Sequence, residues 1–254
     1  SISFSAVDAV NHFFGVASLE NEDVVVQLDR TLAQLFRYVD KTVGLEKTLI
    51  VLSADHGMSE MPEYLQELGY PAGRKYNEQT LDLANRLGQE HFGVNGIAKT
   101  FFRPSLYLNR EAISQAGLDI DEVSAELATQ LTAAKGIGRA VATHELLSRE
   151  HSGLAQQMQR NSHPERSGDI YIAQAPYWFM FEKGAVAAMH GSPWAYDSHV
   201  PIIFSGKGIK GQKVEIAIRT SELEATLNIN SYELSLSYES TYLKFVGYNL
   251  TGTL

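Results

Sequence analysis

Apolar residues recur every three or four positions between residues 23 and 40, and this spacing predicts a helix with one apolar face. Residues 2–5 form a short extended run before it. Residues 48–53 form a near-continuous apolar run after it, which is typical of a strand buried on both faces. The three segments together predict a strand, a helix and a second strand of a parallel sheet.

The middle of the chain has a more mixed pattern. Helical spacing covers residues 78–90 and 121–135, whereas residues 105–109 have the composition of a strand. We therefore predict a cap-like insertion at about residues 62–186, within an α/β domain that covers residues 1–210.

The chain returns to the predicted main sheet through a third apolar run at residues 200–204, directly after His199. Beyond residue 211 the apolar residues alternate with a period of two, which predicts a β-rich segment at residues 211–254. Two interpretations of this segment stay open. It is either the opening of a cohesin-like β-sandwich or an irregular end of the same domain.

Composition narrows the classes of partner. The formal net charge of −9 argues against a nucleic-acid polymer, because binding to such polymers depends on clustered Lys and Arg. The sequence has no apolar run long enough for a membrane span and no signal peptide, and it starts at Ser1 rather than Met, so we expect that the beginning of the protein is missing. With no cysteine among 254 residues, any metal must be held by histidine and carboxylate.

Five such residues come in three sets beside the predicted strands: Asp8 with His12, the adjacent pair Asp55 and His56, and His199. Each set alone has a structural explanation, such as a helix cap or a buried histidine. Together they favour metal binding, because functional groups gather at the carboxyl ends of strands in α/β sheets. Five ligands exceed one open catalytic site, so we expect two metal ions about 4 Å apart.

The motifs around these residues resemble those of a known family. They are Ser-Phe-Ser-Ala-Val-Asp-Ala-Val-Asn-His-Phe-Phe-Gly at 3–15, Ser-Ala-Asp-His-Gly at 53–57 and Tyr-Asp-Ser-His-Val-Pro-Ile at 196–202. They are similar to the metal motifs of the alkaline phosphatase superfamily, in the branch of single-domain bacterial zinc alkaline phosphatases related to type I phosphodiesterases and nucleotide pyrophosphatases.

The resemblance implies a three-layer αβα core, of which this chain carries the C-terminal part, and two Zn²⁺ ions. Asp8, His12 and His199 would hold one zinc, and Asp55 and His56 the other. In the family a Thr or Ser nucleophile comes from a more N-terminal segment, so we expect it before Ser1 and assign no catalytic nucleophile here. The resemblance also implies a periplasmic or extracellular location.

The other histidines rank lower as ligands. His190 lies in Met-His-Gly-Ser-Pro, and we expect it to be structural rather than a metal ligand. His163 belongs to a run that is also similar to the family and is not expected to bind metal. His91, His144 and His151 lie in helical or polar stretches and are most simply solvated.

The function that the resemblance implies is hydrolysis of small phosphate monoesters, by attack of a hydroxyl group on phosphorus and hydrolysis of a covalent phosphoenzyme. Two alternatives remain. The same metals and fold also serve phosphodiester or nucleotide pyrophosphate hydrolysis. The chain could instead be an inactive fragment joined to part of a binding module, since it lacks an assigned nucleophile. Neither the substrate nor the oligomeric state follows from the sequence.

Overall fold

The computed structural model describes residues 1–207. The chain divides into two compact units, and each is described by itself. Among the described residues, the first comprises residues 1–24 and 57–198, and the second comprises residues 25–56 and 199–207. The predicted β-rich segment at residues 211–254 lies outside the described residues, and the predicted domain boundaries remain predictions.

Two helices open the chain, α1 (Ala6–Phe14) and α2 (Leu19–Thr42). The turn between them starts at Gly15, which has a φ of 87°. Its backbone N–H donates a hydrogen bond to the carbonyl oxygen of Asn11. The helix predicted at residues 23–40 is thus confirmed as part of α2. The strand predicted at residues 2–5 is wrong, because helix α1 begins immediately after these residues and no described strand pairs with them.

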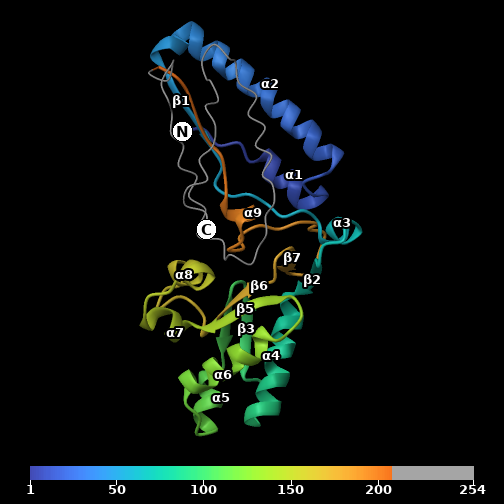
Figure 1. Ribbon diagram of the computed structural model, residues 1–254, viewed down its shortest axis with the longest axis vertical. Helices are drawn as coiled ribbons and strands as arrows, with labels where there is room; N and C mark the ends of the chain where they lie inside the picture. Colours follow the sequence, from blue (N-terminus) through green and yellow to red (C-terminus); the bar gives the residue numbers. More distant parts are fainter. Residues whose placement is uncertain (208–254) are drawn as a thin grey trace. The chain divides into compact units, whose positions relative to one another are not determined.

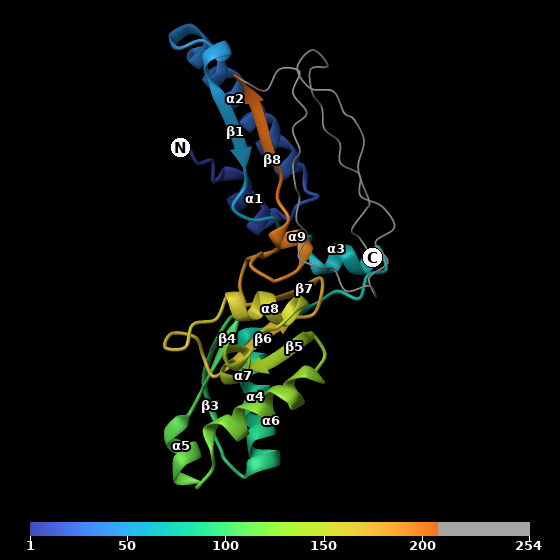
Figure 2. The same cartoon turned by 60° about the vertical axis from the view of Figure 1, so that its left-hand side comes forward.

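In the second unit, strand β1 (Leu49–Ser53) follows a short 3-10 helix, η1 (Leu45–Lys47), and pairs with strand β8 (Ile202–Gly206). The pairing is antiparallel, with Leu49 opposite Gly206 (Figure 2). Both strands were predicted, but burial of the first on both faces was not confirmed. β1 has one partner strand among the described residues, and the side chain of Val51 remains 54% exposed.

The first unit contains a four-stranded sheet with the order β3-β4-β6-β5. Figure 1 labels β3, β5 and β6, and Figure 2 labels β4. Its strands have the following bounds: β3 (Ala98–Phe102), β4 (Ser105–Leu108), β5 (Ile137–Ala142) and β6 (Ile170–Gln174). Neighbouring strands run antiparallel throughout. The strand predicted at residues 105–109 is therefore confirmed as β4.

Strand β6 separates two apolar clusters because its side chains alternate between the faces of the sheet. Ile170 and Ile172 join the larger cluster with α4 (Asn77–Phe92) and α6 (Ile120–Thr132). Tyr171 and Ala173 join a smaller cluster on the other face. The helices of that face are α7 (Thr143–Ser148) and α8 (Gly153–Arg160). Helices α4 and α6 confirm the helical spacing seen in the sequence.

The first unit also contains a second, parallel pair of strands, β2 (Gly73–Tyr76) and β7 (Trp178–Phe181). The short helices are α3 (Pro62–Glu67), α5 (Arg110–Gln115) and α9 (Ala195–Ser198). The loop between β7 and α9 carries residues 182–194, and this loop leads to the candidate site.

Candidate metal centre

Helix α1 carries the first two candidate ligands. Asp8 and His12 are four residues apart, so they lie on the same face of the helix. The Oδ1 atom of Asp8 is 3.5 Å from Nε2 of His12. The Asp-x-x-x-His spacing in the sequence therefore becomes a pair of adjacent ligands once α1 forms.

The loop after β7 brings a third histidine to this pair. Nε2 of His190 lies 3.6 Å from Oδ1 of Asp8, and the imidazole rings of His190 and His12 have their centroids 5.0 Å apart. One ligand atom from each of the three residues lies within 4.8 Å of the other two. Within residues 1–207, Asp8, His12 and His190 are the one group of three or more histidine and acidic side chains that lie close enough together to share a metal ion.

The orientation of His12 is set by the same loop. Nδ1 of His12 donates a hydrogen bond of 2.9 Å to the carbonyl oxygen of Ala188. Because a carbonyl oxygen can only accept, the proton of the neutral ring resides on Nδ1, and Nε2 is left with a free lone pair on the side of Asp8. A hydrogen bond of this kind to the second ring nitrogen is typical of metal-binding histidines.

The two separations from Asp8 fit a tetrahedral ion. Zinc binds imidazole nitrogen and carboxylate oxygen at about 2.0–2.2 Å, so two ligands of a tetrahedral ion lie about 3.3–3.5 Å apart. The separations of 3.5 and 3.6 Å from Asp8 are close to that value. Two histidines and one carboxylate leave a coordination position open, which is the arrangement of a catalytic rather than a structural zinc site.

The segment that carries His190 is anchored at both ends. Nη2 of Arg103 donates to the carbonyl oxygen of His190 over 2.5 Å. Burial lowers the pKa of the Arg103 guanidinium and the charge of Asp197 raises it, so Arg103 remains a cation at neutral pH. Oδ2 of Asp197 accepts the backbone N–H of Ser192 over 2.7 Å. These contacts hold the loop between His190 and Asp197 in one conformation.

The glycine of the Asp-His-Gly motif packs against this segment. The N–H of Gly57 donates to the carbonyl oxygen of Asp197 over 2.7 Å. A Cβ atom on Gly57 would lie 2.1 Å from the carbonyl oxygen of Tyr196. The motif therefore requires glycine at this position because no side chain fits against the backbone of residues 196–197.

The remaining predicted ligands, Asp55, His56 and His199, belong to the second unit. Asp55 and His56 follow β1 directly, and Nε2 of His56 lies 3.8 Å from Oδ1 of Asp55. His199 precedes β8. Their assignment as metal ligands stays a prediction.

His190 is the residue that the sequence interpretation missed. It lies in a loop without periodicity, and its position beside Asp8 depends on the return of the chain from β7 to α1. The one available signal was a histidine followed by Gly-Ser-Pro shortly before a second histidine, His199. That signal does not indicate which of the two reaches the first pair.

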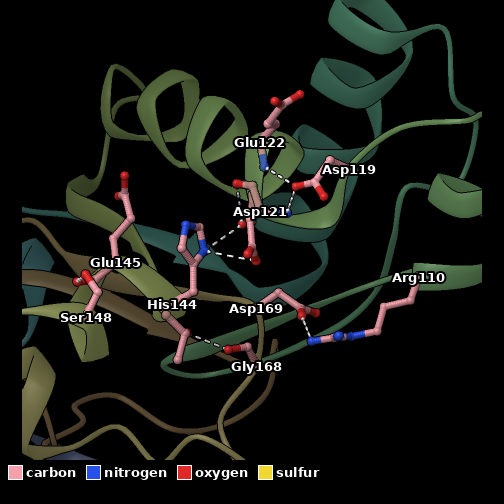
Figure 3. A network of polar contacts seen from close by, with 11 residues as sticks. Arg110, Asp119, Asp121, Glu122, His144, Glu145, Ser148, Gly168 and Asp169 are labelled. Carbon is pink, nitrogen blue, oxygen red and sulfur yellow. Dashed lines mark hydrogen bonds and ion pairs between the residues drawn. The ribbon is translucent and has the colours of Figure 1, made fainter.

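A second polar network surrounds His144 in the first unit (Figure 3). Nδ1 of His144 lies 3.4 Å from Oδ1 of Asp121 and 3.4 Å from Oγ of Ser124. Asp119 caps helix α6 by accepting the backbone N–H groups of Asp121 and Glu122. These contacts stabilise the start of α6, so we assign the network to the structure of the sheet and its helices rather than to chemistry.

The fold and the cluster define a class of protein: an α/β protein with a two-histidine, one-carboxylate group suited to a hydrolytic metal ion. Comparison with known proteins gives the family. The sequence profile of the type I phosphodiesterase / nucleotide pyrophosphatase family matches residues 1–193, and the chain belongs to this family.

Two relatives show how far the sequence similarity extends. The alkaline phosphatase PafA of Elizabethkingia meningoseptica is 30% identical over 83% of this chain and 38% of the relative. A protein of Myroides odoratus named calcium-transporting ATPase is 28% identical over 89% of this chain and 42% of the relative. The chain thus spans about two fifths of the length of these curated relatives.

The crystal structure of wild-type PafA aligns with a TM-score of 0.68 and 28% identity, over 81% of this chain and 39% of that chain. The predicted α/β fold class with an alkaline-phosphatase-like core is therefore confirmed. No helix among residues 1–207 is both long and apolar enough to cross a membrane.

Proposed function

We propose that this chain contributes to a zinc-dependent hydrolase of phosphate esters, and that Asp8, His12 and His190 hold one zinc ion. The observation that carries the proposal is the approach of both imidazole Nε2 atoms to one carboxylate oxygen of Asp8, at 3.5 and 3.6 Å. A zinc ion at this position would polarise a phosphoryl oxygen and offset the negative charge that develops during hydrolysis.

The residues of this chain have a positioning role in the proposal. Asp8 would supply a negatively charged ligand. His12 would bind through Nε2, because its Nδ1–H donates to the carbonyl oxygen of Ala188. The hydrogen bond from Arg103 to the carbonyl oxygen of His190 would hold the third ligand in place. Asp55 and His56 are proposed to hold a second zinc. This rests on the Asp-His-Gly motif and on the family resemblance.

The proposed substrates are small phosphate monoesters. The net charge of the chain is −9, so positive charge for binding an anionic substrate would have to come from bound cations. Curated relatives named alkaline phosphatases support the hydrolysis of phosphate monoesters. The match to the phosphodiesterase family profile supports a second candidate, hydrolysis of phosphodiesters or nucleotide pyrophosphates.

Two model substrates separate these candidates. Initial rates on p-nitrophenyl phosphate and bis-p-nitrophenyl phosphate would be compared for the complete gene product, with zinc and after removal of zinc by a chelator. Faster hydrolysis of the monoester, lost with the metal and restored by zinc, is the expected result. Faster hydrolysis of the diester would select the second candidate, and hydrolysis that survives complete metal removal would contradict the proposal.

The proposal includes a periplasmic or extracellular location, which rests on the family resemblance. Cell fractionation of the native host tests it with an antibody against the chain. Recovery of the protein with cytoplasmic markers would contradict this part of the proposal and leave the chemistry unaffected.

A further inference from the structure

Arg74 and Glu63 form an ion pair that contacts the loop of the candidate metal centre. Arg74 lies in β2 and Glu63 in α3, and the guanidinium group donates from Nε and Nη2 to the two carboxylate oxygens of Glu63, over 2.6 and 2.7 Å. This is the bidentate geometry that makes arginine different from lysine. The side chain of Arg74 is only 19% exposed, whereas that of Glu63 is 57% exposed, so the arginine end of the pair is shielded from water and the carboxylate end is not.

The same guanidinium group makes contacts on its other sides. It donates to the backbone carbonyl oxygens of Val186 and Ala187, over 3.4 and 2.8 Å. Its central carbon lies 4.4 Å from the centroid of the Phe179 ring. The position of Arg74 is thus fixed by a carboxylate, an aromatic face and two carbonyl groups, and Arg74 in turn fixes residues 186 and 187.

Residues 187 and 188 bind His12 directly. The backbone N–H of Ala187 donates to the carbonyl oxygen of His12 over 2.7 Å, and the N–H of Ala188 approaches the same oxygen at 3.3 Å. The carbonyl oxygen of Ala188 accepts the proton on Nδ1 of His12. One short piece of backbone therefore holds both the main chain and the imidazole ring of this candidate ligand.

We propose that Arg74, locked by Glu63, is a positioning residue for the metal ligand His12. It acts through the backbone of residues 186–188, which determines the orientation of the imidazole ring and which ring nitrogen carries the proton. The inference rests on the proposed metal centre. It adds that the affinity of this centre for zinc depends on an ion pair that does not touch the metal.

The size of the expected effect follows from other metal sites. Loss of a group that orients a metal ligand costs about 10- to 100-fold in metal affinity. Arg74 acts one step further away than a direct partner of the ligand, so the lower end of this range, about tenfold, is expected for Arg74→Met. Arg74→Lys keeps the charge but loses the bidentate geometry, so we expect it to restore only part of the affinity.

The test is zinc titration calorimetry of the chain carrying Arg74→Met, Arg74→Lys, Glu63→Gln or His12→Ala. Arg86→Met is the matched control, because Arg86 makes an exposed contact of 4.0 Å with Glu90 in α4. The zinc affinity of the proposed Asp8, His12 and His190 site should fall about tenfold in Arg74→Met, fall less in Glu63→Gln and remain unchanged in Arg86→Met. Thermal unfolding without zinc shows whether each variant is folded.

A second readout does not depend on metal. Nitrogen NMR of the metal-free protein reports which ring nitrogen of His12 carries the proton. In the parent chain the proton should reside on Nδ1, and Arg74→Met should give a mixture of the two neutral forms. A purely structural role for Arg74 would lower the unfolding temperature and leave this signature in place.

Two results would decide between these possibilities. If folded Arg74→Lys and Glu63→Gln retain full zinc affinity and the Nδ1–H form of His12, while His12→Ala loses affinity, the inference is overturned and the metal centre stands. If His12→Ala itself binds zinc as tightly as the parent chain, the proposed metal centre fails first. If Arg74→Met does not fold, Arg74→Lys and Glu63→Gln decide the question.

Discussion

The carboxylate oxygen Oδ1 of Asp8 lies 3.6 Å from Nε2 of His190, although Asp8 is on the first helix and His190 is in the loop after β7. His12 completes the group from the same helix as Asp8. The candidate metal centre thus combines a local pair, whose geometry follows from helix spacing, with one candidate ligand that only tertiary structure supplies.

The first prediction concerns the glycine of the Asp-His-Gly motif. Gly57→Ala should destabilise the protein by about 1–3 kcal/mol, because the new methyl group would overlap the carbonyl oxygen of Tyr196 unless the backbone moves. Urea unfolding measures the loss. Gly184→Ala is the control, since its Cβ would meet no atom within 4 Å. Equal stability of the two variants would show that residues 57 and 196 are not packed as described.

The second prediction tests the core around the four-stranded sheet. Leu127 of α6 is fully buried in the larger apolar cluster, so Leu127→Ala should cost about 2–5 kcal/mol of unfolding free energy. Leu68→Ala removes a side chain that is 57% exposed, and should change stability by less than about 0.5 kcal/mol. Chemical denaturation compares the two. A small loss for Leu127→Ala would contradict the described packing of α6.

The helices of that core were predictable from sequence because each carries a regular apolar face, whereas β4 was the one strand of the four-stranded sheet that the sequence predicted. α4 and α6 follow the periodicity of residues 78–90 and 121–135. The run at residues 2–5 misled the strand prediction because a few extended residues do not form a strand without a partner, and the sequence does not identify that partner.

The candidate site divides in the same way. Asp8 and His12 are recognisable because their spacing places both on one face of a helix. His190 and Arg74 are not, because each reaches the centre through contacts with segments far away in the chain. Residue type and spacing predict the chemistry of such a site better than they predict its complete membership.

The third prediction concerns pH. The hydrogen bond from Arg74 lowers the pKa of Glu63 from its usual value of 4.5, although partial burial acts in the opposite direction. A carboxylate with a lowered pKa stabilises the fold at pH values above its unfolded pKa, and this contribution disappears as the pH falls through the lowered pKa. The stability difference between the parent chain and Glu63→Gln should therefore be constant above about pH 5 and shrink below about pH 4.

Denaturation of both proteins at a series of pH values measures this difference. Glu90→Gln is the matched control, because Glu90 lies on the surface of α4 at 4.0 Å from Arg86. A stability difference for Glu63→Gln that grows as the solution becomes more acidic would have the wrong sign and would refute the described pair.

The most direct test of the central claim is zinc calorimetry of the parent chain, His190→Ala and His199→Ala, with the exposed His91→Ala as control. The geometry predicts that His190→Ala weakens zinc binding at the proposed centre by at least about tenfold, because one of three ligands is lost, while His91→Ala binds as the parent chain does. Full affinity in His190→Ala would contradict the proposed centre. If zinc binding were lost in His199→Ala and kept in His190→Ala, the ligand set predicted from the sequence would replace the one proposed from the structure.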